Sequence, residues 1–347
     1  MHAPEHAHPV DRRRRTLAAG LGLLAIGPFL RPALADPQVR REARVLMGTR
    51  VDIVAQGRDP ALTAAAIAAA FAEMARLERL MSRFRADSQV SALNRGAGRH
   101  AIEPAPEVLA VLRQAREVAA RSGGAFDVTV GAYAGWSFAG GERRVPGDAQ
   151  LAHERLLVDH RDLVIDDPPG RAMLRRAGMR MDLGGIAKLP ILQAGMATLQ
   201  RHGMHDAMIN GGGDVFVNGR LQGRPWRIGL RDPLRPDRLM ARMSLTGGIV
   251  AASGDYERCF EHEGRRYHHV LDPRTGRPST GVHGVVLVSD RLEEINGLGT
   301  AIMVAGTQAG RRLLASLPGV DALIVDDAPR PWVSTGMAHR LQGTAAA

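Results

Sequence analysis

The stretch AMINGGGDVFVNG, residues 207–219, holds two short apolar runs separated by three glycines and an aspartate. Short apolar and β-branched runs bounded by Gly, Asp and Asn are typical of strands joined by a tight turn. No helical pattern follows the glycines, and residues 214–219 continue as strand, so this run does not fit a dinucleotide-binding fingerprint. The same pattern continues through 206–288, for example in GGIVAASGD (247–255) and GVHGVVLVSD (281–290). This region therefore predicts several short antiparallel strands.

Helical patterns surround this strand-rich region. In residues 62–84, Ile67, Phe71 and Met74 recur at helical spacing among alanines, which predicts one amphipathic helix. Similar patterns predict further helices over about 106–121, 190–202 and 292–315, and strands over 43–55 and 320–327. Helices mixed irregularly with antiparallel strands indicate an α+β fold, with mixed or antiparallel sheets and flanking helices.

The N-terminus is predicted to be an export signal. Residues 11–15 read DRRRR, residues 16–30 carry no charge, and the small residues Ala33 and Ala35 stand at a spacing that signal peptidase accepts. The pair Arg14-Arg15 before a mildly apolar core favours the twin-arginine route over an ordinary secretory signal with extra arginines. We therefore expect a leader over 1–35, one domain over 36–347, and a periplasmic location.

The composition of the 347 residues excludes several classes of protein. The formal net charge is +10, of which the leader's five arginines and two acids account for +3, leaving +7 on the mature chain. With only 4% aromatic residues and no basic clusters interleaved with them, nucleic acid is not expected as a partner. No uncharged apolar run reaches the roughly 18–20 residues of a membrane span, so no integral membrane segment is expected after cleavage. A single cysteine excludes an intramolecular disulfide.

The chain contains one lysine, Lys188, among 46 basic residues. It ends the motif DLGGIAK (182–188), at the expected start of a helix, where anions are favoured. A lysine retained among so many arginines suits a site that needs a compact ammonium rather than a planar fork, although a single residue can also survive by chance. Further Gly/Asp turns occur at GGAFD (123–127), NGGGD (210–214), SGDYER (253–258) and DPRTG (272–276). Any one of these could be a plain turn, but consecutive amides in such turns also form anion-binding nests.

Together with MGT (47–49), MSRFRADSQVSALN (81–94) and YHHVLDPRTG (267–276), these motifs occur in the order and spacing of one family. Over residues 43–335 the chain resembles the FAD:protein FMN transferase (ApbE) family. The resemblance implies an α+β fold that binds FAD and Mg²⁺. It also implies transfer of the FMN moiety of FAD onto a threonine hydroxyl of an acceptor flavoprotein, with release of AMP.

The resemblance also assigns residues to the site. Its implied FAD-binding residues are Met47, Phe84, Ala125, Phe126, Asp127, Asp182, Lys188, Val270 and Leu271. Its implied metal ligands are the Gly185 carbonyl and, from INGLGTA (295–301), Asn296 and Thr300. Lys188 would act on the phosphates, and either Asp255 or His269 would be the general base, a choice that spacing alone leaves open. Phosphoryl transfer needs its phosphates held and their charge neutralised, which a lysine and Mg²⁺ can do.

Two positions depart from the family pattern. Asn296 stands where the family usually has Asp, which removes a negative charge from the metal site, and Leu189-Pro190 stand where it usually has Gly-Tyr. Members that load FMN onto the membrane flavoprotein of nitrous-oxide respiration look similar around this segment, which suggests that protein as the acceptor. Two other functions remain open at this point: FAD pyrophosphatase activity giving FMN and AMP, and a non-catalytic periplasmic FAD carrier.

Overall fold

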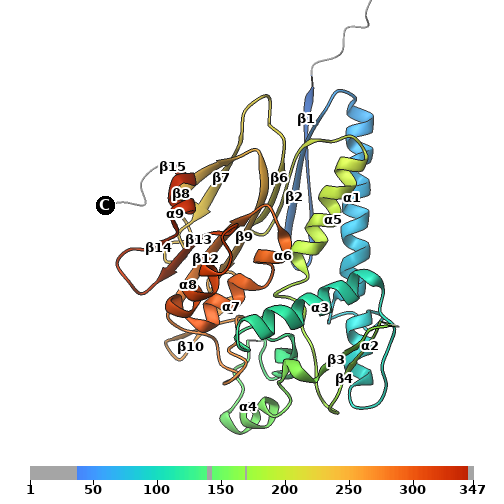
Figure 1. Ribbon diagram of the computed structural model, residues 1–347, viewed down its shortest axis with the longest axis vertical. Coiled ribbons are helices and arrows are strands. Elements are labelled where there is room, and N and C mark those ends of the chain that lie inside the picture. Colours follow the sequence, from blue (N-terminus) through green and yellow to red (C-terminus); the bar gives the residue numbers. More distant parts are fainter. Residues whose placement is uncertain (1–36, 139–142, 169, 343–347) are drawn as a thin grey trace, which may run out of the picture. The chain divides into compact units, whose positions relative to one another are not determined.

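A large antiparallel sheet forms the centre of the protein (Figure 1). The computed structural model describes residues 37–138, 143–168 and 170–342, so the predicted leader lies outside the described residues. The sheet has eight strands in the order β1-β2-β5-β6-β9-β12-β13-β14. The strands are β1 (Gln38–Leu46), β2 (Thr49–Gly57), β5 (Asp206–Gly211), β6 (Asp214–Asn218), β9 (Gly247–Gly254), β12 (Val282–Ser289), β13 (Asp321–Asp326) and β14 (Trp332–Val333).

Three smaller sheets accompany it. One has three strands in the order β15-β8-β7, and the other two are antiparallel pairs, β10 with β11 and β3 with β4. Their bounds are β7 (Trp226–Arg231), β8 (Leu239–Leu245), β15 (Leu341–Gln342), β10 (Cys259–His262), β11 (Arg265–His268), β3 (Leu163–Asp166) and β4 (Arg171–Leu174). The strands predicted within 206–288 are therefore present, and the α+β fold is confirmed.

Helices fill the connections between the strands. The longer ones are α1 (Pro60–Met81), α3 (Pro106–Arg121) and α5 (Lys188–Arg201), close to the bounds expected from the sequence. The others are α2 (Gln89–Gly96), η1 (Val128–Ala132), α4 (Asp148–Arg155), η2 (His160–Asp162), α6 (Leu292–Ile295), α7 (Leu298–Ala305), α8 (Thr307–Ala315) and α9 (Thr335–Arg340). Figure 1 shows α1 and α5 running side by side next to β1 and β2.

The two faces of the large sheet are covered differently. Because successive strand residues point to opposite faces, Ile53 and Ile249 pack with the helices while their neighbours Val54 and Val250 pack with the small sheet. The first cluster includes Phe71 and other residues of α1, α3, α5 and α7, and the second includes residues of β7 and β8. The fold therefore has three layers: helices, the eight-stranded sheet, and the β15-β8-β7 sheet.

Helix α1 is the one described helix that is long and apolar enough, by length and composition alone, to cross a membrane. Ile67, Phe71 and Met74 on one of its faces are almost completely buried and belong to the main core cluster. Asp59 caps its N-terminus by accepting hydrogen bonds from the amides of residues 61 and 62. The apolar face of α1 is therefore explained by its packing against the core of the described domain.

The prediction of one helix over 292–315 is wrong. The structure has three helices there, because Asn296 is extended and Gly297 and Gly306 adopt positive φ values of 75° and 85°. These breaks turn the start of α7 toward the end of β9. A Cβ at Gly299 would lie only 2.6 Å from Ser253 Oγ, so this close approach requires a glycine.

Gly98 provides a test of how tightly the segment before Asp182 is held. Gly98 has a left-handed φ of 72°, and a Cβ there would lie 2.4 Å from the backbone nitrogen of Ala177. We expect Gly98→Ala to lower the free energy of unfolding by more than the roughly 1–2 kcal/mol of left-handed strain. Gly123→Ala is the matched control, since Gly123 also has a positive φ but open space around it. Equal losses in thermal unfolding would contradict the close packing at Gly98.

Candidate functional site

The ammonium of Lys188 is positioned at the first residue of helix α5. Its Nζ lies 3.0 Å from Oδ2 of Asp214, the first residue of β6. Asp214 is only 6% exposed, and its Oδ1 accepts a hydrogen bond of 2.9 Å from the Ala252 amide in β9. The N-terminal end of a helix and a lysine both favour a bound anion. The expected start of a helix at Lys188 is confirmed, and the turn NGGGD supplies the partner of this lysine.

His269 follows β11 and is a neutral histidine. Its amide donates a 3.1 Å hydrogen bond to the Arg258 carbonyl, and its side chain reaches solvent. Desolvation by the surrounding protein, together with the charges of Arg258, His268 and Lys188, lowers the pKa of His269 to about 4. The ring is therefore unprotonated at neutral pH and can accept a proton. Because Lys188 contributes to this shift, the two predicted catalytic residues lie in one electrostatic environment.

The turn at Met47 lies beside the same arginine. Met47 has a left-handed φ of 54°, its amide donates to Glu78 Oε1 at 2.7 Å, and its carbonyl accepts from Arg258 Nη2 at 3.1 Å. Arg258 thus contacts Met47 through its guanidinium and His269 through its carbonyl. Two residues that are far apart in the sequence are brought into one region through this arginine.

Phe126, Gly185 and Thr300 lie side by side. A Cβ at Gly185 would lie 3.2 Å from Phe126 Cε2 and 3.5 Å from Thr300 Oγ1. A Cβ at Gly297 would lie 3.4 Å from the same atom of Phe126, so the ring is next to two glycine turns. Three residues implied by the family resemblance are therefore in contact, at the start of α7 and the DLGGIAK segment.

Asn296 stands in the turn between α6 and α7 and is 1% exposed. Its Nδ2 donates a 2.7 Å hydrogen bond to Oε1 of Gln114 from α3. The Gln114 Nε2 atom is buried and has no hydrogen-bond partner among the described residues. Gln114 thus fixes the orientation of the Asn296 amide by taking its N–H, which leaves the Asn296 carbonyl oxygen for another partner.

Asp182 begins the DLGGIAK segment and pairs with Arg83, with Nε to Oδ2 at 2.9 Å. Its other oxygen accepts the Gly184 amide at 2.8 Å, which shapes the turn leading to Lys188. The guanidinium of Arg83 also lies over the ring of Phe84, 4.5 Å from its centroid. Phe84 is 77% exposed, so its ring is open to a ligand that stacks on it.

Other predicted FAD-binding residues have structural partners. Both carboxylate oxygens of Asp127 are occupied: Oδ1 accepts from Thr129 and Oδ2 accepts from the His160 amide at 2.7 Å. Ala125 and Val270 are buried in the core, and Leu271 pairs with Pro278. At these four positions a ligand would therefore meet main-chain atoms or apolar side chains, and not a polar side chain free to bind it.

Asp255 and His269 differ as candidates for the general base. The buried Asp255 carboxylate contacts Arg266 at 3.3 Å through Oδ1 and His283 Nδ1 at 2.9 Å through Oδ2. Both oxygens of the Asp255 carboxylate are therefore occupied by protein partners. Among the residues that the structure describes, none forms a hydrogen bond or ion pair with the ring of His269, and its side chain is accessible, so the geometry favours His269.

The predicted metal ligands fit Mg²⁺ by donor type. The Gly185 carbonyl, the Asn296 amide oxygen and the Thr300 hydroxyl are all hard oxygens, which Mg²⁺ prefers. Gly185 and Thr300 are adjacent, and the buried Asn296 amide is held with its N–H turned to Gln114. No group of three His, Cys, Asp or Glu side chains suited to a metal occurs in residues 37–138, 143–168 and 170–342. The three predicted ligands are uncharged.

Sequence reasoning missed two residues of this region. Asp214 belongs to the motif NGGGD, but the sequence does not show that this motif lies against Lys188. Gln114 carries no local motif at all, because it sits on α3 and meets Asn296 only through tertiary packing. Its neighbours Arg113 and Arg116 are charged, so the local sequence gives no sign that Gln114 Nε2 is buried.

Comparison with known proteins identifies the family. The ApbE family profile matches residues 47–324. The FAD:protein FMN transferase of Treponema pallidum is 32% identical over 318 residues, covering 86% of this chain and 88% of the relative. That of Klebsiella pneumoniae is 29% identical, covering 84% and 90%.

Solved structures agree with this result. The ApbE protein of Thermotoga maritima superposes with a TM-score of 0.80 at 31% identity, covering 88% of this chain and 100% of that one. The flavin transferase ApbE of Vibrio cholerae gives a TM-score of 0.77 at 25% identity, with the same coverage. The family profile, the relatives and the superpositions all span most of the chain, which therefore belongs to the ApbE family.

Proposed function

We propose that this FAD:protein FMN transferase moves the FMN moiety of FAD onto a threonine hydroxyl of an acceptor flavoprotein, in a Mg²⁺-dependent reaction that releases AMP. Flavin transfer to protein follows from its relatives. The finer proposal rests on one observation: a cation suited to bind phosphate and a histidine suited to accept a proton lie in the same electrostatic environment. Lys188 stands at a helix N-terminus, and its charge helps to keep the accessible His269 unprotonated.

The proposed chemistry is an in-line displacement at phosphorus. The threonine Oγ attacks the phosphorus on the FMN side of the pyrophosphate, and a new P–O bond forms as the bond to the bridging oxygen breaks. AMP leaves with that oxygen, and the threonine proton goes to His269. Such a reaction needs positioning and charge neutralisation more than covalent participation of the protein.

Each residue contributes one part of this reaction. Lys188, oriented by Asp214, holds the charge of the phosphates at the N-terminus of α5. The exposed ring of Phe84 offers aromatic surface for FAD, whereas Phe126 is 4% exposed and supports the glycine turn at Gly185. His269 accepts the proton, because its lowered pKa keeps a lone pair available at neutral pH.

The Gly185 carbonyl, Asn296 and Thr300 would hold Mg²⁺. A bound Mg²⁺ would supply Lewis-acid neutralisation of the phosphate charge. Gln114 holds the Asn296 amide in the orientation that presents its oxygen.

Asn296→Asp tests this metal assignment. We expect the substitution to lower the Mg²⁺ concentration that gives half-maximal rate, because a carboxylate adds a negative charge to a site of neutral donors. Isothermal titration of Mg²⁺ into the FAD-loaded protein gives a second measurement, independent of turnover. The double variant Asn296→Asp/Gln114→Met also removes Gln114 Oε1, the buried acceptor that faces position 296. An unchanged Mg²⁺ dependence in both variants would contradict the ligand assignment.

We also propose that the enzyme is exported by the twin-arginine route, loses residues 1–35 and acts in the periplasm. This rests on Arg14-Arg15, the uncharged run 16–30 and the small residues before Asp36. The proposed acceptor is a flavoprotein exposed to the same compartment, with the membrane flavoprotein of nitrous-oxide respiration as the first candidate. Replacing Arg14 and Arg15 by Lys should leave unprocessed precursor in the cytoplasm, detected by immunoblotting of cell fractions.

One assay separates the proposal from its two alternatives. Residues 36–347 are incubated with FAD, Mg²⁺ and a soluble fragment of the candidate acceptor that contains its threonine. We expect flavin fluorescence that stays on the fragment in a denaturing gel. Free FMN without labelled fragment would indicate a pyrophosphatase, and intact bound FAD would indicate a carrier.

A further inference from the structure

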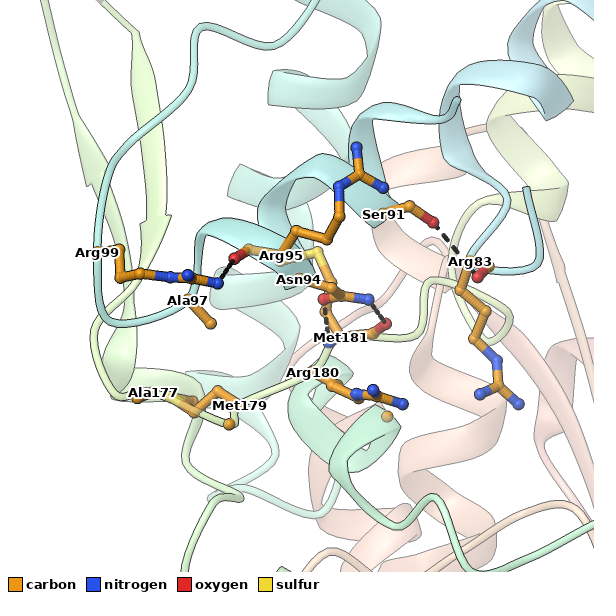
Figure 2. Close-up of a pocket in the computed structure, with 12 residues that line it drawn as sticks. Arg83, Ser91, Asn94, Arg95, Ala97, Arg99, Ala177, Met179, Arg180 and Met181 are labelled. Carbon is orange, nitrogen blue, oxygen red and sulfur yellow. Dashed lines mark hydrogen bonds between the residues drawn. The ribbon is translucent and has the colours of Figure 1, made fainter. Parts of the chain in front are cut away.

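An open pocket of about 690 Å³ lies on the outer side of the segment that precedes Asp182 (Figure 2). It is lined mainly by residues of α2 and by residues 177–181, together with Gly131. Four of its twelve lining residues are arginines, and none is acidic: Arg83, Arg95, Arg99 and Arg180. An arginine-rich cavity without carboxylates is suited to an anionic ligand.

The wall of this pocket is fixed by backbone contacts. Asn94 of α2 holds Met181 in both directions: its Oδ1 accepts the Met181 amide at 2.8 Å, and its Nδ2 donates to the Met181 carbonyl at 3.2 Å. A Cβ at Gly131 would lie 2.5 Å from the Met181 carbonyl carbon, so the two segments are in close contact. The dashed lines in Figure 2 show the Asn94 pair. The arginines therefore project from a well-defined frame.

Three of the four arginines have no carboxylate partner in the described part of the chain. Arg95 Nη1 donates to the Ala86 carbonyl at 2.7 Å, and Arg99 Nη2 donates to the Arg95 carbonyl at 2.6 Å. These bonds orient the side chains and leave their charges uncompensated. Arg180 is exposed and has no side-chain partner among residues 37–138, 143–168 and 170–342. Only Arg83 is paired, with Asp182.

The pocket is adjacent to the proposed FAD site but is built from different residues. Arg83 joins the two, because it lines the pocket and pairs with Asp182 at the start of DLGGIAK. Phe126, Lys188 and His269, by contrast, do not line it. Figure 2 shows the four guanidiniums on different sides of the hollow rather than converging on one point. This spread suits several separate negative charges better than a single phosphate.

We propose that this arginine pocket binds an acidic segment of the acceptor protein and so positions its hydroxyl next to the bound flavin nucleotide. The inference rests on the proposed transfer to a protein acceptor. Carboxylates of Asp and Glu side chains pair with guanidinium groups in fork geometry, and such pairs steer charged partners toward each other. In this arrangement the nucleotide binds at Lys188 and the N-terminus of α5, and the acceptor binds at the arginines of the pocket.

The test reverses two charges that the FAD site does not use. In the double variant Arg99→Glu/Arg180→Glu, we expect the KM for the acceptor fragment to rise at least about tenfold, through two lost pairs and new repulsion. The KM for FAD is expected to stay unchanged. The matched control is Arg224→Glu/Arg227→Glu, which makes the same charge change near and on β7, away from the pocket. It should leave the KM for the acceptor near the wild-type value.

A binding measurement makes the result independent of turnover. A fluorescein-labelled oligo-aspartate peptide is titrated against the FAD-loaded protein at low salt and followed by fluorescence anisotropy. The wild type and the β7 control should bind it, and the pocket variant should not. Equal binding by all three proteins would overturn the proposal, as would a pocket variant whose KM rises for FAD and not for the acceptor. Absence of transfer by the wild type would instead contradict the proposed function.

Discussion

His269→Ala is expected to reduce kcat for FMN transfer by about 10²–10⁴-fold, the range that a positioned general base contributes. His269 is accessible and its ring has no carboxylate partner in the described part of the chain, whereas both oxygens of Asp255 are occupied. The KM for FAD should change little, because the ring acts on the acceptor proton. The measurement is the initial rate of fluorescent labelling of the acceptor fragment.

The matched control for this variant is His262→Ala, in the neighbouring strand β10 and exposed to solvent. It should retain the wild-type rate. A His269→Ala enzyme that keeps its full rate, with Asp255→Asn inactive but folded by circular dichroism, would assign the base to Asp255.

The pH profile follows from the same residue. Because desolvation by the surrounding protein and neighbouring cations lower the pKa of His269 to about 4, the base is available above that pH and becomes protonated below it. We expect kcat/KM to be flat on the acid side down to about pH 5 and to fall as pH passes through about 4. An acid limb near the ordinary histidine pKa of about 6.5 would contradict this environment.

Lys188→Met is expected to lower kcat/KM by about 10²–10³-fold, the loss seen when one preorganised charge-stabilising donor is removed. It should also raise the pKa of His269, because the Lys188 charge is one cause of its depression. The acid limb of the pH profile should therefore move to higher pH in this variant. An unshifted acid limb would contradict the electrostatic contribution of Lys188 to the pKa of His269.

Lys188→Arg is the companion variant. It keeps the charge but replaces a compact ammonium with a planar fork opposite the buried Asp214. We expect the KM of Lys188→Arg for FAD to be nearer to the wild-type value than that of Lys188→Met. Its kcat should remain almost as low as that of Lys188→Met. Full activity of Lys188→Arg would show that any cation suffices at this position.

The sequence was most informative about local elements. Helices α1, α3 and α5 follow from apolar spacing, and the β5–β6 hairpin follows from NGGGD between two apolar runs. The sequence predicts one helix over 292–315 because the apolar pattern continues through Gly297 and Gly306, whose positive φ values break the helix in the structure. The three-layer arrangement could not be predicted, since the alternation of Ile53 and Val54 says only that both faces are covered.

The site shows the same division. The motifs identified Lys188, Phe126 and Gly185, but not the pairs that orient them. Lys188 meets Asp214, and Asn296 meets Gln114, through strands and helices distant in the sequence. The arginine pocket could not be predicted either, because arginines occur throughout this chain and the four that line the pocket form no distinctive motif. Only the fold shows which arginines lack a carboxylate partner.

The central claim is that this chain attaches FMN covalently to a protein threonine. Mass spectrometry of the acceptor fragment after incubation with residues 36–347, FAD and Mg²⁺ tests it most directly. The account predicts a mass gain equal to one FMN moiety, localised to a single threonine, with AMP released in equal amount. Complete conversion of FAD to FMN and AMP with an unmodified fragment, when a known ApbE transferase labels the same fragment, would contradict it.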